Sequence, residues 1–398
     1  MRATVRCWAF LLALSAGIAG CGGEVATGPV VVSVSVKPVF ALAVGRGDTV
    51  RFTAVARDET GASVSGTSIT WRSENPAVAT VDGQGRAVAV VTGSTAVTAT
   101  SGGALGLAML EVWAPPAVSS YKPGTSYFGR QSYVEYIPGE LPVILSVPHG
   151  GSLEPLEIPD RTVGTTVTDT NANPTLLAVR DALVERTGKA PHIILSHLRR
   201  TKLDPNREIV EAAQGNAFAE NAWEEFQGFI DIASAAVVKT YGSGFYIDIH
   251  GHGHAVPRAE LGYMLTAAQL NRTDAEIDAQ NLRAQSSIRA LAEASPLLFS
   301  QLLRGNKSLG GYLQAQGVRS VPSPSDALPG SEEYFTGGYN TGRHGSLPPG
   351  RTVSGVQIEL PFPGIRDSDA NRRAFARALA TALEAYMLEH FGFFRAPR

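Results

Sequence analysis

The chain has 398 residues, a hydrophobic fraction of 44% and a formal net charge of −2. This length exceeds the usual size of one domain, so we expect two folded units with real hydrophobic cores. The near-neutral charge and the lack of Lys/Arg-rich runs argue against nucleic acid as a partner.

The N-terminus is predicted to be a targeting segment. Two arginines precede the apolar run Cys7–Ile18, which is too short for a membrane-spanning helix. Small residues then lead to Cys21, a pattern that resembles the lipobox of bacterial lipoproteins. The resemblance implies a signal peptide at residues 1–20, a lipid anchor on Cys21 and a tether at residues 21–29. An ordinary secretory signal with a chance cysteine is the alternative.

Cleavage at this point would remove Cys7 and leave the lipidated Cys21 as the last cysteine. We therefore expect neither a disulfide framework nor a metal site with cysteine ligands. The expected location is outside the cytoplasm, as a membrane-anchored lipoprotein in the periplasm, in the outer membrane or on the cell surface.

Residues 30–113 are predicted to form an all-β sandwich, because short alternating segments are separated there by Gly, Pro, Asn and Asp. The stretch Ile69–Asp82, with the glycines that follow it, resembles bacterial Ig-like domains of group 2. All eight histidines lie at or after His149, so we expect this unit to be a spacer or adhesive stalk, with Trp71 in its core. The predicted strands are Val32–Val36, Val50–Ala56, Ile69–Trp71, Ala87–Val91 and Thr95–Thr100.

A stiff linker at residues 114–132, containing Ala-Pro-Pro-Ala, leads to a second unit at residues 133–398. Strands alternate with helices in this unit, which predicts an α/β sandwich around a mostly parallel, mixed sheet. The predicted strands are Leu141–Val147, His192–Ser196, a strand from Phe245, Gly262–Leu265 and Val353–Leu360. The predicted helices are Asn171–Gly188, Asn216–Tyr241, Leu282–Ala294 and Asp367–Phe391.

The run Phe245–His254 (Phe-Tyr-Ile-Asp-Ile-His-Gly-His-Gly-His) is the strongest candidate for a metal site. It is predicted to be a buried strand that ends in a loop, where Gly251 and Gly253 let the backbone bend. Open α/β sheets bind ligands at the carboxyl ends of their strands, and His149 follows another buried strand. We therefore expect His149 and His250 to meet; polar filler in a turn is the alternative for the alternating histidines.

The third ligand is expected to be a carboxylate. Asp169 is favoured, because a predicted helix N-terminus would hold it and keep it ionised. If Asp169 only caps that helix, Glu154 becomes the ligand. Two histidines and one carboxylate with an open fourth position are typical of a catalytic zinc site.

Glu359 is expected to serve a site, because a carboxylate inside an apolar strand is costly otherwise. It could act as a general base, and the alternative is an edge-strand residue facing solvent. Asn206 and Arg207 offer donors suited to a substrate carboxylate, although an ordinary surface loop with internal Asp–Arg pairing would contain the same residues.

The Gly-rich loop Tyr334–His344 is predicted to be either a lid over the substrate or a long surface loop. In a lid, Tyr339, Arg343 and His344 would contact the substrate.

Six short motifs occur in an order that resembles the N-formylglutamate amidohydrolase family, itself similar in fold to zinc carboxypeptidases. The resemblance covers Tyr133–Phe391. The motifs are Pro148-His-Gly-Gly151, Thr168-Asp169, Leu203-Asp-Pro-Asn-Arg207, Ile247-Asp-Ile-His250, Gly337-Gly338 and Gln357-Ile-Glu359.

This resemblance implies zinc on His149, Asp169 and His250, a substrate carboxylate on Asn206 and Arg207, and Glu359 as general base. The chain departs from the family pattern in the extra His252 and His254, and in its exported, Ig-fused architecture. The expected function is zinc-dependent hydrolysis of N-acyl amino acids or short peptides with a free carboxylate. The alternative is a surface-anchored adhesion or envelope-binding protein with an inactive hydrolase-like domain.

Overall fold

The structure is a computed structural model that describes residues 30–44, 46–113 and 121–393. The predicted signal peptide, the tether and Cys21 lie outside the described residues. Within the described part, no helix is both long and apolar enough to cross a membrane.

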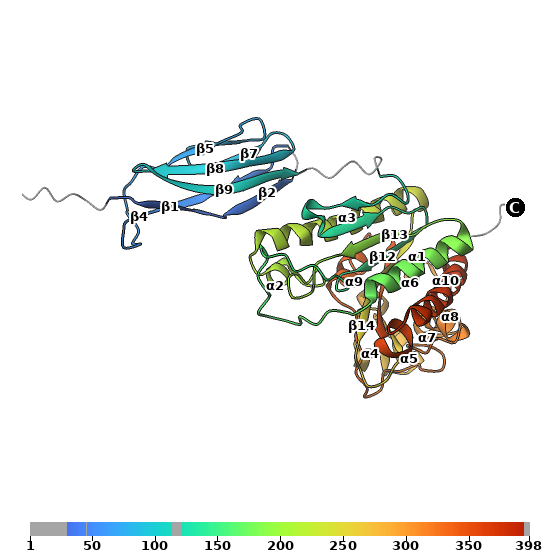
Figure 1. Cartoon of the computed structure of the whole chain (residues 1–398). Helices are drawn as coiled ribbons and strands as arrows, with labels where there is room; N and C mark the ends of the chain where they lie inside the picture. Colours follow the sequence, from blue (N-terminus) through green and yellow to red (C-terminus); the bar gives the residue numbers. More distant parts are fainter. Residues whose placement is uncertain (1–29, 45, 114–120, 394–398) are drawn as a thin grey trace, which may run out of the picture.

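The N-terminal unit is a β-sandwich, as predicted (Figure 1). Inward side chains of its strands, among them Val36, Ala99 and Leu110, form one core. Trp71 packs against this core, and Gly85 takes a positive φ of 79° where a Cβ would lie 2.8 Å from the indole. The strands are β1 (Ser33–Lys37), β2 (Phe40–Val44), β3 (Thr49–Arg51), β4 (Thr53–Arg57), β5 (Thr70–Ser73), β6 (Ala79–Val81), β7 (Arg86–Ala89), β8 (Gly93–Ser101) and β9 (Ala104–Trp113).

The C-terminal unit contains a mixed, mostly parallel sheet in the order β10-β11-β13-β12-β14-β17-β15-β16. Its central strands β13, β12, β14 and β17 are parallel, whereas β11 runs antiparallel to β10 and β13, and β15 runs antiparallel to β17 and parallel to β16. The sheet begins inside the segment predicted to be a linker. The strands are β10 (Tyr127–Phe128), β11 (Val134–Ile137), β12 (Val143–Val147), β13 (His192–Ser196), β14 (Gly244–His252), β15 (Ala259–Gly262), β16 (Ser320–Val321) and β17 (Val353–Pro361).

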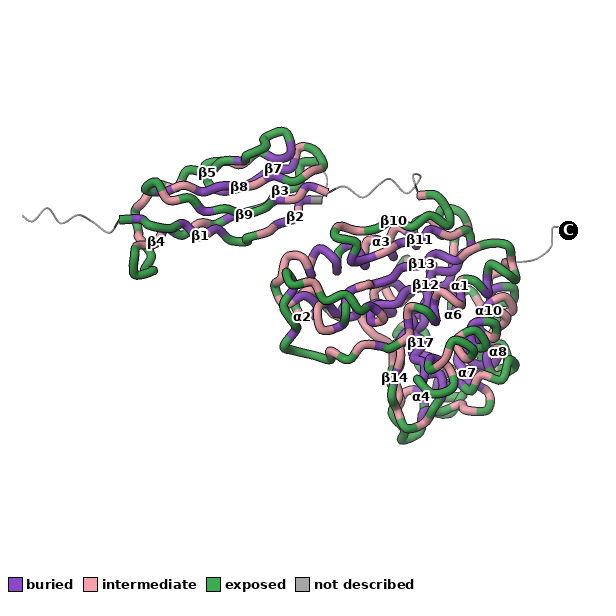
Figure 2. Tube along the Cα trace, in the orientation of Figure 1, coloured by how far each residue is buried: buried purple, intermediate pink, exposed green. Residues whose placement is uncertain are grey.

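Helices cover both faces of this sheet, and the central strands between them are buried (Figure 2). Leu145 and Ile247 pack with helices α1 and α10, whereas Ile144 and Tyr246 pack with α3 on the opposite face. This period of two explains why these strands are apolar throughout. The helices are α1 (Ala172–Thr187), α2 (Ile209–Ala213), α3 (Ala217–Tyr241), α4 (Ala267–Leu270), α5 (Asp274–Ala279), α6 (Arg289–Ala294), α7 (Phe299–Arg304), α8 (Leu309–Ala315), α9 (Tyr339–His344) and α10 (Asp369–Phe391).

Two predicted elements differ from the structure. The helix predicted at Leu282–Ala294 is a 3-10 turn followed by α6. The break lies at Ser286 and Ser287, where the Ser286 hydroxyl and the Ser287 N–H both donate to the carbonyl of Tyr263. The strand predicted at Gly262–Leu265 lies earlier, as β15.

Candidate metal centre

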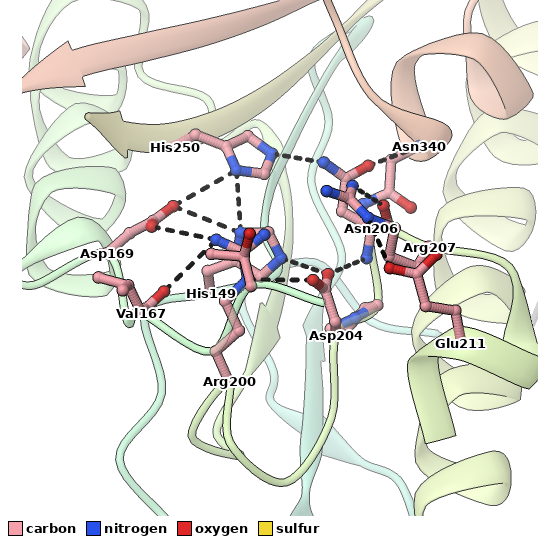
Figure 3. Close-up of polar contacts among 12 residues, drawn as sticks. His149, Val167, Asp169, Arg200, Asp204, Asn206, Arg207, Glu211, His250 and Asn340 are labelled. Carbon is pink, nitrogen blue, oxygen red and sulfur yellow. Dashed lines mark hydrogen bonds and ion pairs between the residues drawn. The ribbon is translucent and has the colours of Figure 1, made fainter. Parts of the chain in front are cut away.

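Three predicted ligands meet at the carboxyl ends of β12 and β14 (Figure 3). The Nδ1 atoms of His149 and His250 are 3.1 Å apart, and Asp169 Oδ2 lies 3.4 Å and 3.3 Å from them. All three residues are buried. A tetrahedral zinc with bonds of about 2.0–2.1 Å separates its ligand atoms by about 3.3 Å, so this triad fits the metal that the resemblance implies.

Each imidazole is held by a second carboxylate on its far nitrogen. His149 Nε2 is 2.6 Å from Asp204 Oδ1, and His250 Nε2 is 2.8 Å from Asp248 Oδ2. These contacts place the ring proton on Nε2 and leave the Nδ1 lone pair for a cation. The sequence reasoning missed both carboxylates, although strand alternation puts Asp248 on the same face as His250.

Asp169 reaches this position in a different way from the one predicted. Helix α1 begins at Ala172, and the Asp169 carboxylate accepts the backbone N–H of Gly251 at 3.0 Å instead of capping the helix. Burial opposes its ionisation, but hydrogen bonds and charges of the two histidines outweigh burial and hold the pKa of Asp169 well below its usual range. The open alternative, Glu154, lies at the surface and pairs with Arg199 at 2.7 Å.

Only one of the two glycines after His250 lies in the predicted loop, since Gly251 is inside strand β14 and Gly253 follows it. Strand β14 continues to His252, and Gly251 and Gly253 are not among the residues with positive φ. A Cβ on Gly251 would lie 2.2 Å from the Arg366 guanidinium carbon. Gly251 therefore permits the close approach of Arg366, which donates to the carbonyls of His252 and Leu360 at 3.3 Å and 3.1 Å.

Glu359 lies inside the sheet and not on an edge strand. Strand β17 pairs with β14 and β15, which places Glu359 in register with His250 on one side and Glu260 on the other. Gln357 donates to the Glu359 carboxyl group at 2.8 Å. Burial raises the pKa of Glu359 to about 8 against the opposing charges of His250 and Arg200, and the charges of Asp169 and Glu260 act in the same direction as burial.

A cavity of about 150 Å³, here called the site cavity, connects these groups. It is lined by the triad, Glu359, Gln357, Asn206, Arg207 and three residues that the sequence reasoning did not single out: Thr165, Arg200 and Phe335. Arg200 is buried, with Nε 3.0 Å from Asp204 Oδ2 and Nη1 3.8 Å from Asp169 Oδ1. In the sequence, Arg200 stands beside Arg199 and close to Lys202, and nothing else marked it as a site residue.

The pair predicted to hold a carboxylate does reach the site cavity. Asn206 is buried, and its side-chain oxygen accepts the N–H of Asn340 at 2.9 Å. Arg207 is partly exposed, with 35% of its side chain accessible, and its Nε lies 3.3 Å from Glu211 Oε1. Glu211 already supplies an anionic partner for Arg207. The charge of Arg207 alone therefore does not show that it binds a substrate carboxylate.

The predicted lid residues lie elsewhere. Residues 339–344 form helix α9, in which Tyr339 packs against Trp223 and Arg343 pairs with Asp231 at 3.2 Å. His344 is buried and donates to Gln227 at 2.6 Å. None of the three lines the site cavity, so their positions do not support the predicted substrate contacts; the described part of this loop contributes Phe335, Gly337 and Gly338 instead.

Comparisons with known proteins bear most directly on the N-terminal unit. The family model of the bacterial Ig-like domain (group 2) matches residues 30–108, as the resemblance implied. No curated protein sequence matches the chain.

Among solved structures, domains 4 and 5 of the surface-layer protein SbsC share 22% identity, with 21% of this chain and 53% of that chain covered and a TM-score of 0.19. N-formylglutamate amidohydrolase from Ralstonia eutropha JMP134 shares 12% identity over 63% of this chain and 98% of that chain, with a TM-score of 0.38. A gene product from Agrobacterium tumefaciens shares 17% identity over 64% and 94%, with a TM-score of 0.36. Function has to be argued from the site, because likeness at this level does not carry it.

Proposed function

We propose that the C-terminal unit is a zinc-dependent amide hydrolase that acts on N-acyl amino acids, such as N-formyl derivatives, or on short peptides with a free carboxylate. The observation that carries this proposal is the triad of His149, Asp169 and His250, whose ligand atoms lie 3.1–3.4 Å apart beside Glu359. Three protein ligands leave a fourth position for water or substrate, which is the arrangement of a catalytic zinc.

The chain's own residues have distinct roles in this proposal. Zinc, when bound, would polarise the scissile carbonyl and activate water. Glu359 accepts a proton from the attacking water and returns it to the leaving amine, while Gln357 orients its carboxylate. Asp204 and Asp248 fix the two imidazoles.

Hydrogen-bond donors that line the site cavity would select substrates with a carboxylate. Asn206 and Arg207 would bind its carboxylate, and Arg200 adds a guanidinium beside the triad. The convergence of the triad and Glu359 on one cavity favours the enzyme over the alternative of an inactive, adhesive domain, in which no such convergence is needed.

The proposal is tested by metal analysis together with a substrate screen. Purified protein is expected to contain stoichiometric zinc, and His250→Ala is expected to lose both an equivalent of zinc and the activity. Wild-type protein without stoichiometric zinc would overturn the metal site.

The screen pairs each N-formyl or N-acetyl amino acid with its methyl ester or amide. Faster cleavage of the free acids is expected. Equal rates within each pair would remove the carboxylate preference and leave the hydrolase proposal standing.

We further propose that the chain is an exported lipoprotein, anchored to a membrane through Cys21, with the Ig-like unit as a spacer. The pattern before Cys21 supports this. Cys21→Ser is expected to move the protein from the membrane fraction to the soluble exported fraction. Cys7→Ser, inside the proposed signal peptide, is the control and should leave the distribution unchanged; equal membrane association of the Cys21→Ser protein would refute the anchor.

A further inference from the structure

A second group of metal-ligand residues lies beside the site and has no role in the hydrolysis proposed above. His252, His254 and Glu260 offer ligand atoms that all lie within 4.8 Å of one another. They belong to one short stretch, in which His252 ends β14, His254 is in the following loop and Glu260 is in β15. The local chain alone therefore assembles this cluster.

Glu260 is a fully buried carboxylate in β15. Its Oε1 lies 2.8 Å from His254 Nδ1, and its Oε2 accepts the backbone N–H of Phe335 at 2.8 Å. Among the described residues, Glu260 forms one ion pair, with His254. Burial of a carboxylate is costly without a full countercharge, which a divalent cation would supply.

His252 is oriented in the way that metal-ligating histidines are. Its Nε2 donates to the carbonyl of Arg258 at 2.9 Å, so the lone pair is on Nδ1. Nδ1 accepts the N–H of His254 at 3.1 Å, and a bound cation would compete with that N–H for the lone pair. The rings of His252 and His254 have centroids 4.9 Å apart, close to the 4.8 Å of His149 and His250 in the first triad.

Phe335 connects this cluster to the site cavity. Its ring stacks on His254, with centroids 4.6 Å apart and planes at 14°, and its N–H is held by Glu260. The same residue lines the site cavity. A ligand that holds His254 and Glu260 in place would therefore also hold Phe335, which lines that cavity.

We propose that His252, His254 and Glu260 bind a second divalent cation, which holds Phe335 in place as a wall of the site cavity. Two imidazoles and one carboxylate suit zinc or a similar first-row metal. This second site does not depend on hydrolase activity or on the identity of a substrate.

The test is the number of metal ions bound by the purified full chain after saturation with Zn²⁺ or Co²⁺ and removal of free metal. Wild-type protein is expected to hold two equivalents. His254→Gln and Glu260→Gln should each hold one, His250→Ala should hold one, and the double variant His250→Ala/Glu260→Gln should hold none. Glu135→Gln is the matched control: Glu135 also pairs with a histidine, His197 at 3.0 Å, but lies outside both clusters, so two equivalents should remain.

One equivalent in the wild-type protein would overturn the second site, as would two equivalents in both His254→Gln and Glu260→Gln. The wild-type count needs no variant, so it decides the question even if Glu260→Gln fails to fold. Hydrogen exchange tests the role of Phe335: its amide should exchange more slowly in metal-loaded than in metal-free protein. An unchanged rate in protein that holds two equivalents would refute that role.

Discussion

At the scale of single residues, Glu359 carries the most specific prediction about activity. Glu359→Gln keeps the shape and the partner Gln357 but removes the base, so kcat should fall by about 10²–10⁴ with zinc content unchanged. Steady-state kinetics and metal analysis measure both. Glu154→Gln, at an exposed carboxylate outside the site, is the control and should keep full activity; a similar loss in both variants would contradict the assignment.

The raised pKa of Glu359 also predicts how the stability of the metal-free protein depends on pH. Its pKa rises from 4.5 to about 8 on folding, so between these values the folded state binds more protons than the unfolded state. Stability should therefore fall as pH rises through this window, by a few kcal/mol in all. Bound metal would lower this pKa and weaken the effect.

Urea unfolding of chelator-treated protein at about pH 5 and about pH 9 measures this dependence. Glu359→Gln should gain stability relative to wild type as pH rises, because it has no proton to lose. An equal pH dependence in both proteins would show that other groups cause it.

Glu211 would compete with a substrate carboxylate for Arg207, because its Oε1 lies 3.3 Å from Arg207 Nε. Arg207→Lys should raise KM for free-acid substrates by roughly tenfold, because an ammonium cannot make a two-pronged contact. Glu211→Gln should have the opposite effect, since it removes the competing anion. Methyl esters serve as the control substrates, and equal changes in KM for acids and esters would remove Arg207 from carboxylate recognition.

The ligand histidines were predictable because each lies close to the carboxyl end of a buried parallel strand, and such strand ends meet at one sheet edge. Asp204, the outer partner of His149, and the cavity residue Arg200 were not predictable, because their contacts depend on how loops fold back. The Gly-rich composition of the loop predicts lid contacts for Tyr339 and Arg343. Composition does not predict that both residues lie in helix α9 and contact Trp223.

At the scale of elements, the end of β14 depends on Gly251. Gly251→Ala would place a methyl group 2.2 Å from the Arg366 guanidinium carbon and disturb the N–H that holds Asp169. We expect a loss of about 1–3 kcal/mol in unfolding free energy, and weaker zinc binding. Gly253→Ala is the matched control, since nothing lies within 4 Å of its added Cβ; equal effects of the two substitutions on unfolding and zinc affinity would contradict this reasoning.

The long helices and the central strands of the C-terminal unit followed from the sequence, and the short helices did not. Helices α1, α3 and α10 and strands β13 and β17 lie within two residues of their predicted ends, because apolar periodicity extends over their whole length. Helices α4, α5, α7 and α8 span seven residues or fewer, too short for such a pattern. The start of α6 likewise depends on tertiary contacts, because the Ser286 hydroxyl and the Ser287 N–H before it donate to the carbonyl of Tyr263.

At the scale of the whole molecule, the division into a β-sandwich and an α/β sandwich followed from a change of pattern along the chain. Short alternating segments give way to long apolar strands and helices, and all histidines lie on one side of that change. The start of the second sheet was harder to locate, because β10 has two residues and forms only as the partner of β11. A strand of that length has no periodicity to detect.

The metal is expected to stabilise the folded C-terminal unit as a whole, because the first triad joins the end of β14 to residues that follow β12 and precede α1. These segments come together only in the folded chain, so a cation that binds them stabilises that state by mass action. At a free metal concentration of about 100 times Kd, one site contributes about 2.7 kcal/mol. For a unit of this size that corresponds to roughly 5–10 °C in Tm.

Differential scanning calorimetry of the full chain with Zn²⁺ and with a chelator measures this shift. Chelation should lower the Tm of the wild type, whereas His250→Ala should retain only the part of the shift that comes from the second site. The double variant His250→Ala/Glu260→Gln should melt at the same temperature in both conditions, because no metal cluster remains among the described residues. A wild-type Tm that does not respond to chelation would mean that neither cluster holds a cation in solution.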